Sequence, residues 1–298
     1  MSVLVTGLSG FVGSWCRRQM PCVDLALDGK FVDLRDADRV RLAIEAIRPQ
    51  AVIHLAAQSD VPSSIADAAE TYAINFGGTF NLLTALATAG FAGRCLYVGS
   101  ADVYGTVPEA QLPISEQRPM RPLNPYAVSK VAAEALCYQW SQTGPFEIVI
   151  ARPFNHIGPR QSDRFAVASF ARQIAAHRAG RGAGRLRVGD IDTTRDFTDV
   201  RDIVRAYAML LERGRNGEAY NVCSGVERTL REVIGALLKA AGVDMQIEVD
   251  TDRLRRVEQR RMSGSFAKLH ADTGWQPEIP FDQTLVDTLA YWDEEDIE

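Results

Sequence analysis

Near its amino terminus the chain reads Val3-Leu-Val-Thr-Gly-Leu-Ser-Gly-Phe-Val-Gly13, an apolar run followed by three glycines at intervals of three residues. The apolar run is typical of a buried strand, and such glycines allow a tight turn, close approach of a pyrophosphate and close packing of the next helix. The helix expected over residues 10–20 would hold the phosphates with its free N–H groups and its dipole. A glycine-rich turn in some other strand–helix unit is the alternative. The stretch predicts a dinucleotide site that includes Gly7, Gly10, Phe11, Val12 and Gly13.

Strand-like and helix-like segments alternate through the first half of the chain. We expect strands at residues 2–6, 24–28, 51–55, 94–99 and 147–152, and helices at 10–20, 37–48, 66–90 and 125–142. Such alternation implies an α/β fold with a doubly wound parallel sheet, which binds ligands at the carboxyl ends of its strands. Past residue 152 the pattern is less regular, with a helix expected at 165–180 and a strand at 218–222. We predict a dinucleotide-binding domain of residues 1–152 plus 191–225 and a smaller C-terminal α/β substrate lobe of residues 153–190 plus 226–298.

A second constellation lies in Asn124-Pro-Tyr-Ala-Val-Ser-Lys130, which we consider together with Ser100. The i, i+4 spacing places Tyr126 and Lys130 on one face of a helix. A free phenol titrates near pH ~10, and an adjacent ammonium group and an oxidised nicotinamide would both favour the phenolate. Ser100 ends the fourth strand at the same sheet edge as the glycine-rich turn, where its hydroxyl could orient a carbonyl for hydride transfer. Alone, the Tyr-x-x-x-Lys pattern also fits a solvated helix face. Asp102 is open to three roles: a further acid–base group, a substrate ligand or a turn residue.

The expected second strand ends at Asp28, where a carboxylate can accept hydrogen bonds from both adenosine ribose hydroxyls and thereby favour NAD. The alternative is a solvated aspartate in an Asp28-Gly29 turn. No arginine directly follows this strand, although Arg17, Arg18 and Lys30 keep NADP possible. Further coenzyme contacts are expected from Asp33 and Leu34 at the adenine edge, and from Leu55, Ala56, Ala57, Ser59, Tyr126 and Lys130 towards the nicotinamide end.

Composition restricts the class of protein. The 298 residues carry a net charge of -5, which does not favour nucleic acid or an acidic membrane as a partner. The five cysteines show no paired framework, so we expect a reducing cytosol, and no metal site is predicted. No apolar run approaches the ~18 residues that a membrane span requires.

The chain resembles the extended short-chain dehydrogenase/reductase family, which comprises nucleotide-sugar epimerases, dehydratases and reductases. The resemblance covers essentially the whole chain and implies that Ser100, Tyr126 and Lys130 are catalytic and that Asn155 contacts the sugar nucleotide. It also implies a homodimer formed through the helices expected at 66–90 and 125–142. The motifs that carry it are Thr6-Gly-x-x-Gly-Phe-Val-Gly13, His54-Leu-Ala-Ala57, Asn75-Phe-Gly-Gly-Thr79, Ser100-Ala-Asp-Val-Tyr-Gly105, Tyr126-Ala-Val-Ser-Lys130 and Arg152-Pro-Phe-Asn-His-Ile-Gly-Pro159.

Two later stretches resemble the GDP-sugar branch of this family, Arg195-Asp-Phe-Thr-Asp-Val-Arg-Asp202 and Arg255-Arg-Val-Glu258. The guanidinium groups of Arg195 and Arg255 suit a diphosphate, and Glu258 can accept hydrogen bonds from a ribose or a guanine. A set of surface salt bridges is the alternative. The branch contains 4,6-dehydratases and 4-keto reductases, and the run from Phe154 to Gln161 resembles the reductases. Substrate contacts are expected from Asp102, Val103, Asn155, Arg160, Arg195, Arg255 and Glu258.

Three enzyme activities and one non-catalytic role fit these residues. A reductase needs a hydride, a proton from Tyr126 and orientation by Ser100. A dehydratase also needs a base for C5 and an acid for the C6 hydroxyl, and the inert Ala101 leaves only Asp102 for that work. A 4-epimerase would use the same trio with retained NAD, whereas a non-catalytic NAD(P)-binding regulator tends to lose the tyrosine or the lysine. We predict a cytoplasmic reductase that uses NADPH or NADH to convert GDP-4-keto-6-deoxy-D-mannose to GDP-D-rhamnose, a precursor of bacterial surface polysaccharide such as lipopolysaccharide.

Overall fold

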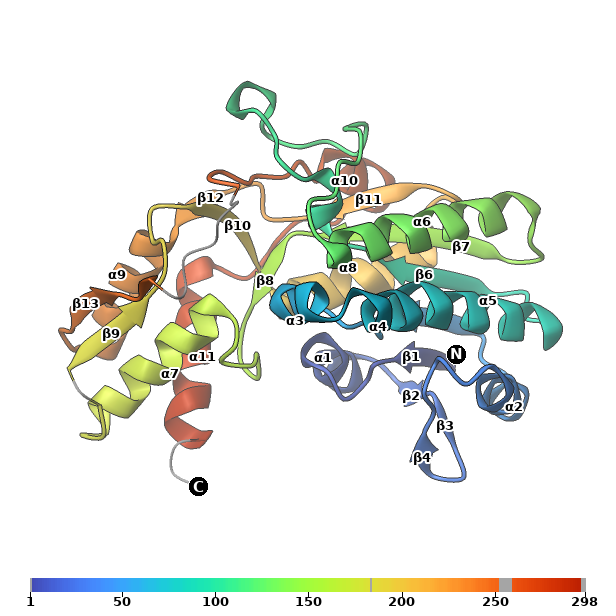
Figure 1. The fold of residues 1–298 in the computed structure, drawn as a ribbon, viewed down its shortest axis with the longest axis horizontal. Helices are drawn as coiled ribbons and strands as arrows, with labels where there is room; N and C mark the ends of the chain where they lie inside the picture. Colours follow the sequence, from blue (N-terminus) through green and yellow to red (C-terminus); the bar gives the residue numbers. More distant parts are fainter. Residues whose placement is uncertain (1, 183, 252–258, 296–298) are drawn as a thin grey trace.

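A six-stranded parallel sheet forms the centre of the protein, for which a computed structural model describes residues 2–182, 184–251 and 259–295 (Figure 1). The strand order is β11-β7-β6-β5-β1-β2. It reverses direction between β1 and β5, and such a switch point opens a crevice at the carboxyl ends of the strands. This sheet confirms the predicted fold class. Its strands are β1 (Val3–Thr6), β2 (Cys22–Asp24), β5 (Ala51–His54), β6 (Arg94–Val98), β7 (Glu147–Pro153) and β11 (Ala219–Val222).

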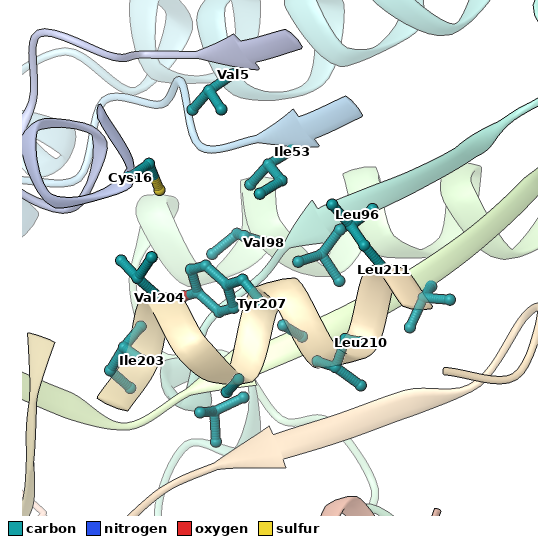
Figure 2. Packing of buried hydrophobic residues seen from close by; sticks show 14 of the residues in the cluster. Val5, Cys16, Ile53, Leu96, Val98, Ile203, Val204, Tyr207, Leu210 and Leu211 are labelled. Atoms are coloured by element: carbon teal, nitrogen blue, oxygen red, sulfur yellow. The ribbon is translucent and has the colours of Figure 1, made fainter. Parts of the chain in front are cut away.

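Helices cover both faces of the large sheet. One face packs against α2 (Ala37–Ile47), α5 (Gly78–Thr88) and α6 (Pro125–Thr143). The other packs against α1 (Phe11–Gln19), α8 (Val200–Arg213) and α10 (Ala267–Thr273). Figure 2 shows the contact on this second face, where Tyr207 of α8 lies beside Val98 of β6. Within the described ranges, none of the helices is long and apolar enough to cross a membrane.

The second strand differs from the prediction. Strand β2 ends at Asp24, and the residues after it form an antiparallel hairpin of β3 (Ala26–Leu27) and β4 (Lys30–Phe31). The two turn residues, Asp28 and Gly29, have φ angles of 52° and 72°. Two consecutive positive φ angles are typical of the type I′ turn, which favours the dipeptide Asp-Gly. The predicted strand over 24–28 was therefore wrong, because its second half turns back on itself.

The helix predicted over 66–90 is divided into α4 (Ala68–Tyr72), a π-helical turn η1 (Ala73–Gly77) and α5, and a separate helix α3 (Val61–Ala66) precedes it. Asp60 and Asp67 each start a new helix, because their carboxylates accept hydrogen bonds from the N–H groups of Ser63 (2.8 Å) and Glu70 (2.9 Å). The π-helical turn places Asn75 inside the protein, where it is 2% exposed. Single π-helical turns are frequent at functional sites.

The described part of the second lobe contains two small sheets and three helices. Strands β8 (Asn155–Ile157), β10 (Thr194–Asp199) and β12 (Glu227–Thr229) form one sheet, and β9 (Arg185–Val188) and β13 (Gln246–Val249) form the other. Helices α7 (Ala166–Arg178), α9 (Leu230–Ala241) and α11 (Phe281–Glu295) share its hydrophobic core. Residues 194–199 thus pair within this lobe, although the segment 191–225 was assigned to the dinucleotide-binding domain, whereas α8 and β11 pack with the large sheet.

Aspartates of the stretch 195–202 hold the second lobe together. The buried carboxylate of Asp196 accepts hydrogen bonds from the N–H groups of Ser224, Gly225 and Gly264. The carboxylate of Asp202 accepts from two consecutive N–H groups, at residues 278 and 279. These carboxylates satisfy backbone donors of segments distant in sequence, so they act in folding.

Candidate active site

Ser100 and Tyr126 meet at the carboxyl edge of the large sheet. Ser100 directly follows β6 and begins the 3-10 turn η2 (Ala101–Tyr104), since its Oγ accepts a hydrogen bond from the N–H of Asp102 at 3.1 Å. Tyr126 lies in the first turn of α6, which Asn124 caps by accepting from the N–H of Ala127 at 2.8 Å. Both side chains are almost buried, and the Ser100 hydroxyl lies near enough to the Tyr126 phenol to lower its pKa. The strand end and the helix start therefore hold two hydroxyl groups together.

The surroundings of Tyr126 keep its phenol protonated. Burial raises the pKa of Tyr126 above its ordinary value, the charge of Asp102 raises it further, and the nearby Ser100 hydroxyl lowers it. We had expected Lys130 to lower this pKa, but burial is the dominant cause in the protein alone. A protonated phenol is a proton donor, which suits the reduction of a carbonyl better than the oxidation of an alcohol.

Lys130 lies one turn further along α6 and is 4% exposed. Its Nζ donates a hydrogen bond to the carbonyl of Val98 at 2.8 Å and lies 5.9 Å from the ring centroid of Tyr126. Burial lowers the pKa of Lys130 to about 8. The predicted trio of Ser100, Tyr126 and Lys130 thus comes together at one sheet edge, with the amine beside the ring.

The glycine-rich turn has the shape of a phosphate cradle. Gly7 has a φ of +78°, and a Cβ on it would lie 3.0 Å from the backbone of Ala56. A Cβ on Gly13 would lie 2.3 Å from the carbonyl oxygen of Gly7, so α1 can pack this closely only with glycine. Gly10 begins α1 without a capping side chain, and the N–H groups of the first turn remain available to a pyrophosphate. Leu55 and Ala57 flank Ala56 directly after β5, next to this turn. These residues fit a dinucleotide.

A buried hydrogen-bond network connects the glycine-rich turn to the catalytic helix. The imidazole of His54 bonds the hydroxyls of Thr6 and Thr79, at 2.7 and 2.9 Å. Burial lowers the pKa of His54 to about 3, so the ring is neutral. The motifs that contain Thr6, His54 and Thr79 were identified in the sequence, but no role was predicted for these side chains. The network runs through Thr6, His54, Thr79, Asn75 and Ser129 to the backbone carbonyl of Tyr126.

The adenosine end of the site differs from the prediction. Asp28 lies at the exposed tip of the β3–β4 hairpin, so it does not mark the carboxyl end of a sheet strand. That position belongs to Asp24, which the prediction missed because the strand ends four residues earlier. Asp33 is exposed and pairs with Arg35, whereas Leu34 is buried beneath α5. The Asp-Gly dipeptide was the sequence signal for this arrangement.

The substrate side of the crevice is formed by the segment after β7. Asn155 on β8 is exposed, and Arg160 has a φ of +77°, with its guanidinium 5.9 Å from the ring centroid of Tyr291. The indole N–H of Trp15 in α1 donates to the carbonyl of Pro159 at 2.9 Å. The helix expected to bind phosphates therefore packs directly against the segment that includes Asn155.

Other predicted residues lie elsewhere or have backbone partners. The side chain of Val103 is fully buried in an apolar cluster beneath η2, so it does not face the crevice. Arg195 donates to the carbonyls of Thr194 and Gln259, at 2.7 and 2.9 Å. Ser59 is exposed in the loop after β5. Arg255 and Glu258 lie outside the described residues.

Comparison with known proteins identifies the family. The family described as GDP-mannose 4,6 dehydratase matches residues 26–288. A GDP-6-deoxy-D-mannose reductase of Pseudomonas aeruginosa is 49% identical over 296 residues, which cover 98% of this chain and 97% of the relative.

Solved structures of relatives have the same architecture. The structure of RMD from Pseudomonas aeruginosa complexed with NADPH superposes with a TM-score of 0.92 at 48% identity and covers 99% of both chains. A Thermus thermophilus UDP-glucose 4-epimerase in complex with NAD gives a TM-score of 0.85 at 31% identity, with 98% of this chain and 99% of that one covered. The predicted family resemblance is confirmed: the chain belongs to the GDP-mannose 4,6 dehydratase family.

Proposed function

We propose that the protein is an NAD(P)H-dependent reductase that converts the C4 ketone of GDP-4-keto-6-deoxy-D-mannose to the alcohol of GDP-D-rhamnose (GDP-6-deoxy-D-mannose). The observation that carries the proposal is that Ser100, Tyr126 and Lys130 lie together at the sheet edge that also carries the glycine-rich turn. The choice of sugar is supported by the GDP-6-deoxy-D-mannose reductase that is 49% identical to this chain.

The reaction requires one hydride and one proton, and the bound reduced nicotinamide supplies the hydride. Ser100 donates a hydrogen bond to the ketone oxygen and holds the carbonyl in place. Tyr126 gives its proton to that oxygen as negative charge develops. The ammonium of Lys130, beside the Tyr126 ring, stabilises the phenolate that is left.

Dehydration is the second candidate, because the matching family is described as a GDP-mannose 4,6 dehydratase. A dehydratase must also remove the C5 proton and expel the C6 hydroxyl, which requires further acid–base groups. The turn after Ser100 offers Asp102 for this work, while Ala101 has no titratable group. The observation that favours reduction is the 49% identity of this chain to a GDP-6-deoxy-D-mannose reductase.

Substrate contacts are proposed for the exposed Asn155 and for the guanidinium groups of Arg160 and Arg195. A diphosphate accepts hydrogen bonds from such groups. Arg255 and Glu258 are proposed on the sequence motif alone. For Val103, only a backbone contact is compatible with its burial.

A homodimer is proposed from an exposed apolar surface on α4, η1, α5 and α6. Tyr72, Phe76 and Phe80 recur every four residues and are 38%, 40% and 47% exposed. Val128 and Tyr138 of α6 are 40% and 55% exposed, and α4 packs beside α6. A large apolar surface on a soluble protein marks an interaction site, and a two-fold axis would bury it against its own copy.

The enzyme is proposed to work in the cytoplasm and to supply a precursor of surface polysaccharide such as lipopolysaccharide. All five cysteines are free thiols, which is typical of a reducing compartment.

Absorbance at 340 nm tests the activity directly. Purified protein is incubated with GDP-4-keto-6-deoxy-D-mannose and with NADH or NADPH. We expect coenzyme oxidation by the wild type and a loss of about 100- to 10,000-fold in Tyr126→Phe, since the proton donor is removed. Tyr138→Phe is the matched control, because this tyrosine is exposed on the same helix and should retain full activity.

Two results would contradict the proposal: no oxidation of either coenzyme by the wild type, or undiminished turnover in Tyr126→Phe. Conversion of GDP-mannose to the keto sugar without net change at 340 nm would instead assign the dehydratase activity.

A further inference from the structure

The side-chain amide of Gln259 holds the backbone of Val107 with two hydrogen bonds. Its Oε1 accepts from the N–H of Val107, and its Nε2 donates to the carbonyl of the same residue, both at 2.9 Å. An amide placed in this way pairs with a residue as a neighbouring strand does, so it fixes both the position and the orientation of that backbone. The two residues are 152 positions apart in the sequence, and the contact therefore joins two distant segments.

Val107 closely follows the catalytic turn (residues 100–104), which begins at Ser100 and includes η2. Its side chain is 3% exposed and packs in one apolar cluster with Val103 and Tyr104 of that turn. Closely packed side chains transmit a displacement of one to the others. The position of Val107 therefore bears on the position of Ser100.

The backbone at Gln259 is held by the second lobe. The carbonyl of Gln259 accepts a hydrogen bond from the guanidinium of Arg195 on β10 at 2.9 Å. The carbonyl of the next residue, Arg260, accepts from the N–H of Thr194 on the same strand at 2.8 Å. Gln259 thus connects β10 of the second lobe to the segment that follows the catalytic turn.

Two further contacts join the same pair of segments. Ile114 and Gly264 form a β-bridge. The guanidinium of Arg261 lies 3.1 Å from a carboxylate oxygen of Glu109, but these side chains are 42% and 65% exposed, and such pairs contribute little. Of the three contacts, the one that Gln259 makes is nearest in sequence to the catalytic turn.

We propose that Gln259 is a positioning residue for the reduction, because it holds the catalytic turn at a fixed place relative to the second lobe. The inference rests on the proposed function, since it concerns the alignment of the same ketone. The ketone must meet Ser100 and Tyr126 while the nucleotide end of the substrate is bound by the second lobe. A misplacement of about 1 Å can lower the rate of an enzyme by about 100-fold, so the connection between lobe and turn bears directly on turnover.

Amide hydrogen exchange tests the positioning without turnover. The N–H of Asp102 reports on the catalytic turn, because it donates to Ser100 Oγ at 3.1 Å. We expect Gln259→Ala to speed exchange of this amide by about tenfold, which corresponds to the loss of about one hydrogen bond that restrains the turn. Amides of α2 in the large domain should exchange as in the wild type, which excludes a global loss of stability. The matched control is Gln283→Ala, which removes an exposed glutamine of α11 and should leave the Asp102 amide unchanged.

Steady-state kinetics with the keto sugar and reduced coenzyme test the consequence for catalysis. We expect Gln259→Ala to lower kcat/KM by about 10- to 100-fold and Gln283→Ala to leave it unchanged. In a Ser100→Ala background, Gln259→Ala should lower it by no more than about twofold further, since residues that serve one alignment are not additive. A role in general stability would instead give the same factor in both backgrounds.

An Asp102 amide that exchanges at the wild-type rate in Gln259→Ala would overturn the inference, and so would equal factors in the two kinetic backgrounds. Both results leave the reductase proposal intact, because the wild type is assayed alongside. Failure of the wild type to oxidise either coenzyme would remove the proposed function and this inference with it. If Gln259→Ala does not fold, Gln259→Glu replaces it in both experiments, since it keeps the shape but loses the donor to the carbonyl of Val107. If Ser100→Ala is too slow to assay, the exchange of the Asp102 amide decides alone.

Discussion

Breaking the buried ion pair between Glu134 and Arg152 should strongly destabilise the protein. Glu134 of α6 and Arg152 of β7 have side chains only 6% and 7% exposed, and Arg152 Nε lies 3.0 Å from Glu134 Oε2. At this distance two unit charges attract by about 5 kcal/mol with an effective dielectric constant near 20. Removing one partner leaves the other charge buried, and we expect Glu134→Ala to lower the free energy of unfolding by about 3–5 kcal/mol.

Urea denaturation followed by circular dichroism measures this loss. The control is Glu45→Ala on α2, which breaks an i, i+4 pair whose side chains are both 43% exposed and should cost about 0.3–0.5 kcal/mol. Glu134→Gln keeps hydrogen-bonding atoms without the charge and should fall between the two. Arg152 also donates to the Tyr104 hydroxyl at 2.8 Å, so the turn after Ser100 loses support together with the pair. A loss in Glu134→Ala as small as that in Glu45→Ala would refute the reasoning.

Two further predictions concern the catalytic helix and its outer face. The pKa of Lys130 is about 8 in the folded protein and about 10.4 in the unfolded chain, so the unfolded state binds more protons between these values. Burial of the charged Lys130 therefore destabilises the fold fully below pH 8, and this penalty of up to about 3 kcal/mol disappears as pH rises to 10.4. Urea denaturation of the wild type and of Lys130→Met from pH 7 to 10 should give free energies of unfolding that converge as pH rises. A difference between the two proteins that stays constant with pH would contradict the lowered pKa of Lys130. Phe76→Glu should convert the proposed dimer to monomers in sedimentation analysis. The control is Val286→Glu, which places a charge at an apolar position that is 47% exposed on α11 and should leave the dimer intact. A dimer that survives Phe76→Glu would exclude the surface of α4, η1, α5 and α6 as the interface.

Much of the fold could be predicted because its signals are local. The glycine spacing of residues 7–13, the alternation of strands and helices, and the i, i+4 pair of Tyr126 and Lys130 each require only a short window of sequence. The Asp28-Gly29 turn was also a local signal, but an apolar strand pattern competed with it. The strand therefore ends at Asp24, and Asp28 lies in the turn of the β3–β4 hairpin.

Other features depend on contacts between distant segments and could not be derived from windows of sequence. The bond from Trp15 to Pro159 spans 144 residues, and the network through His54 and Asn75 joins β1, β5, η1, α5 and α6 of the large domain. Arg195 is predicted to bind a phosphate because guanidinium groups suit phosphates, and the structure adds a partner distant in sequence, the carbonyl of Gln259. Side-chain chemistry predicts which partners suit a residue, while the fold decides which of them come within reach.

The short edge strand β2 also affects how molecules of this protein can associate. It forms one margin of the large sheet, is only three residues long, and leaves the sheet at once into the β3–β4 hairpin. Such a margin offers few open backbone groups to an incoming strand, which is a common protection against sheet extension and fibril growth. Self-association at that end of the sheet is thereby disfavoured, and contacts between molecules are left to side chains on helices.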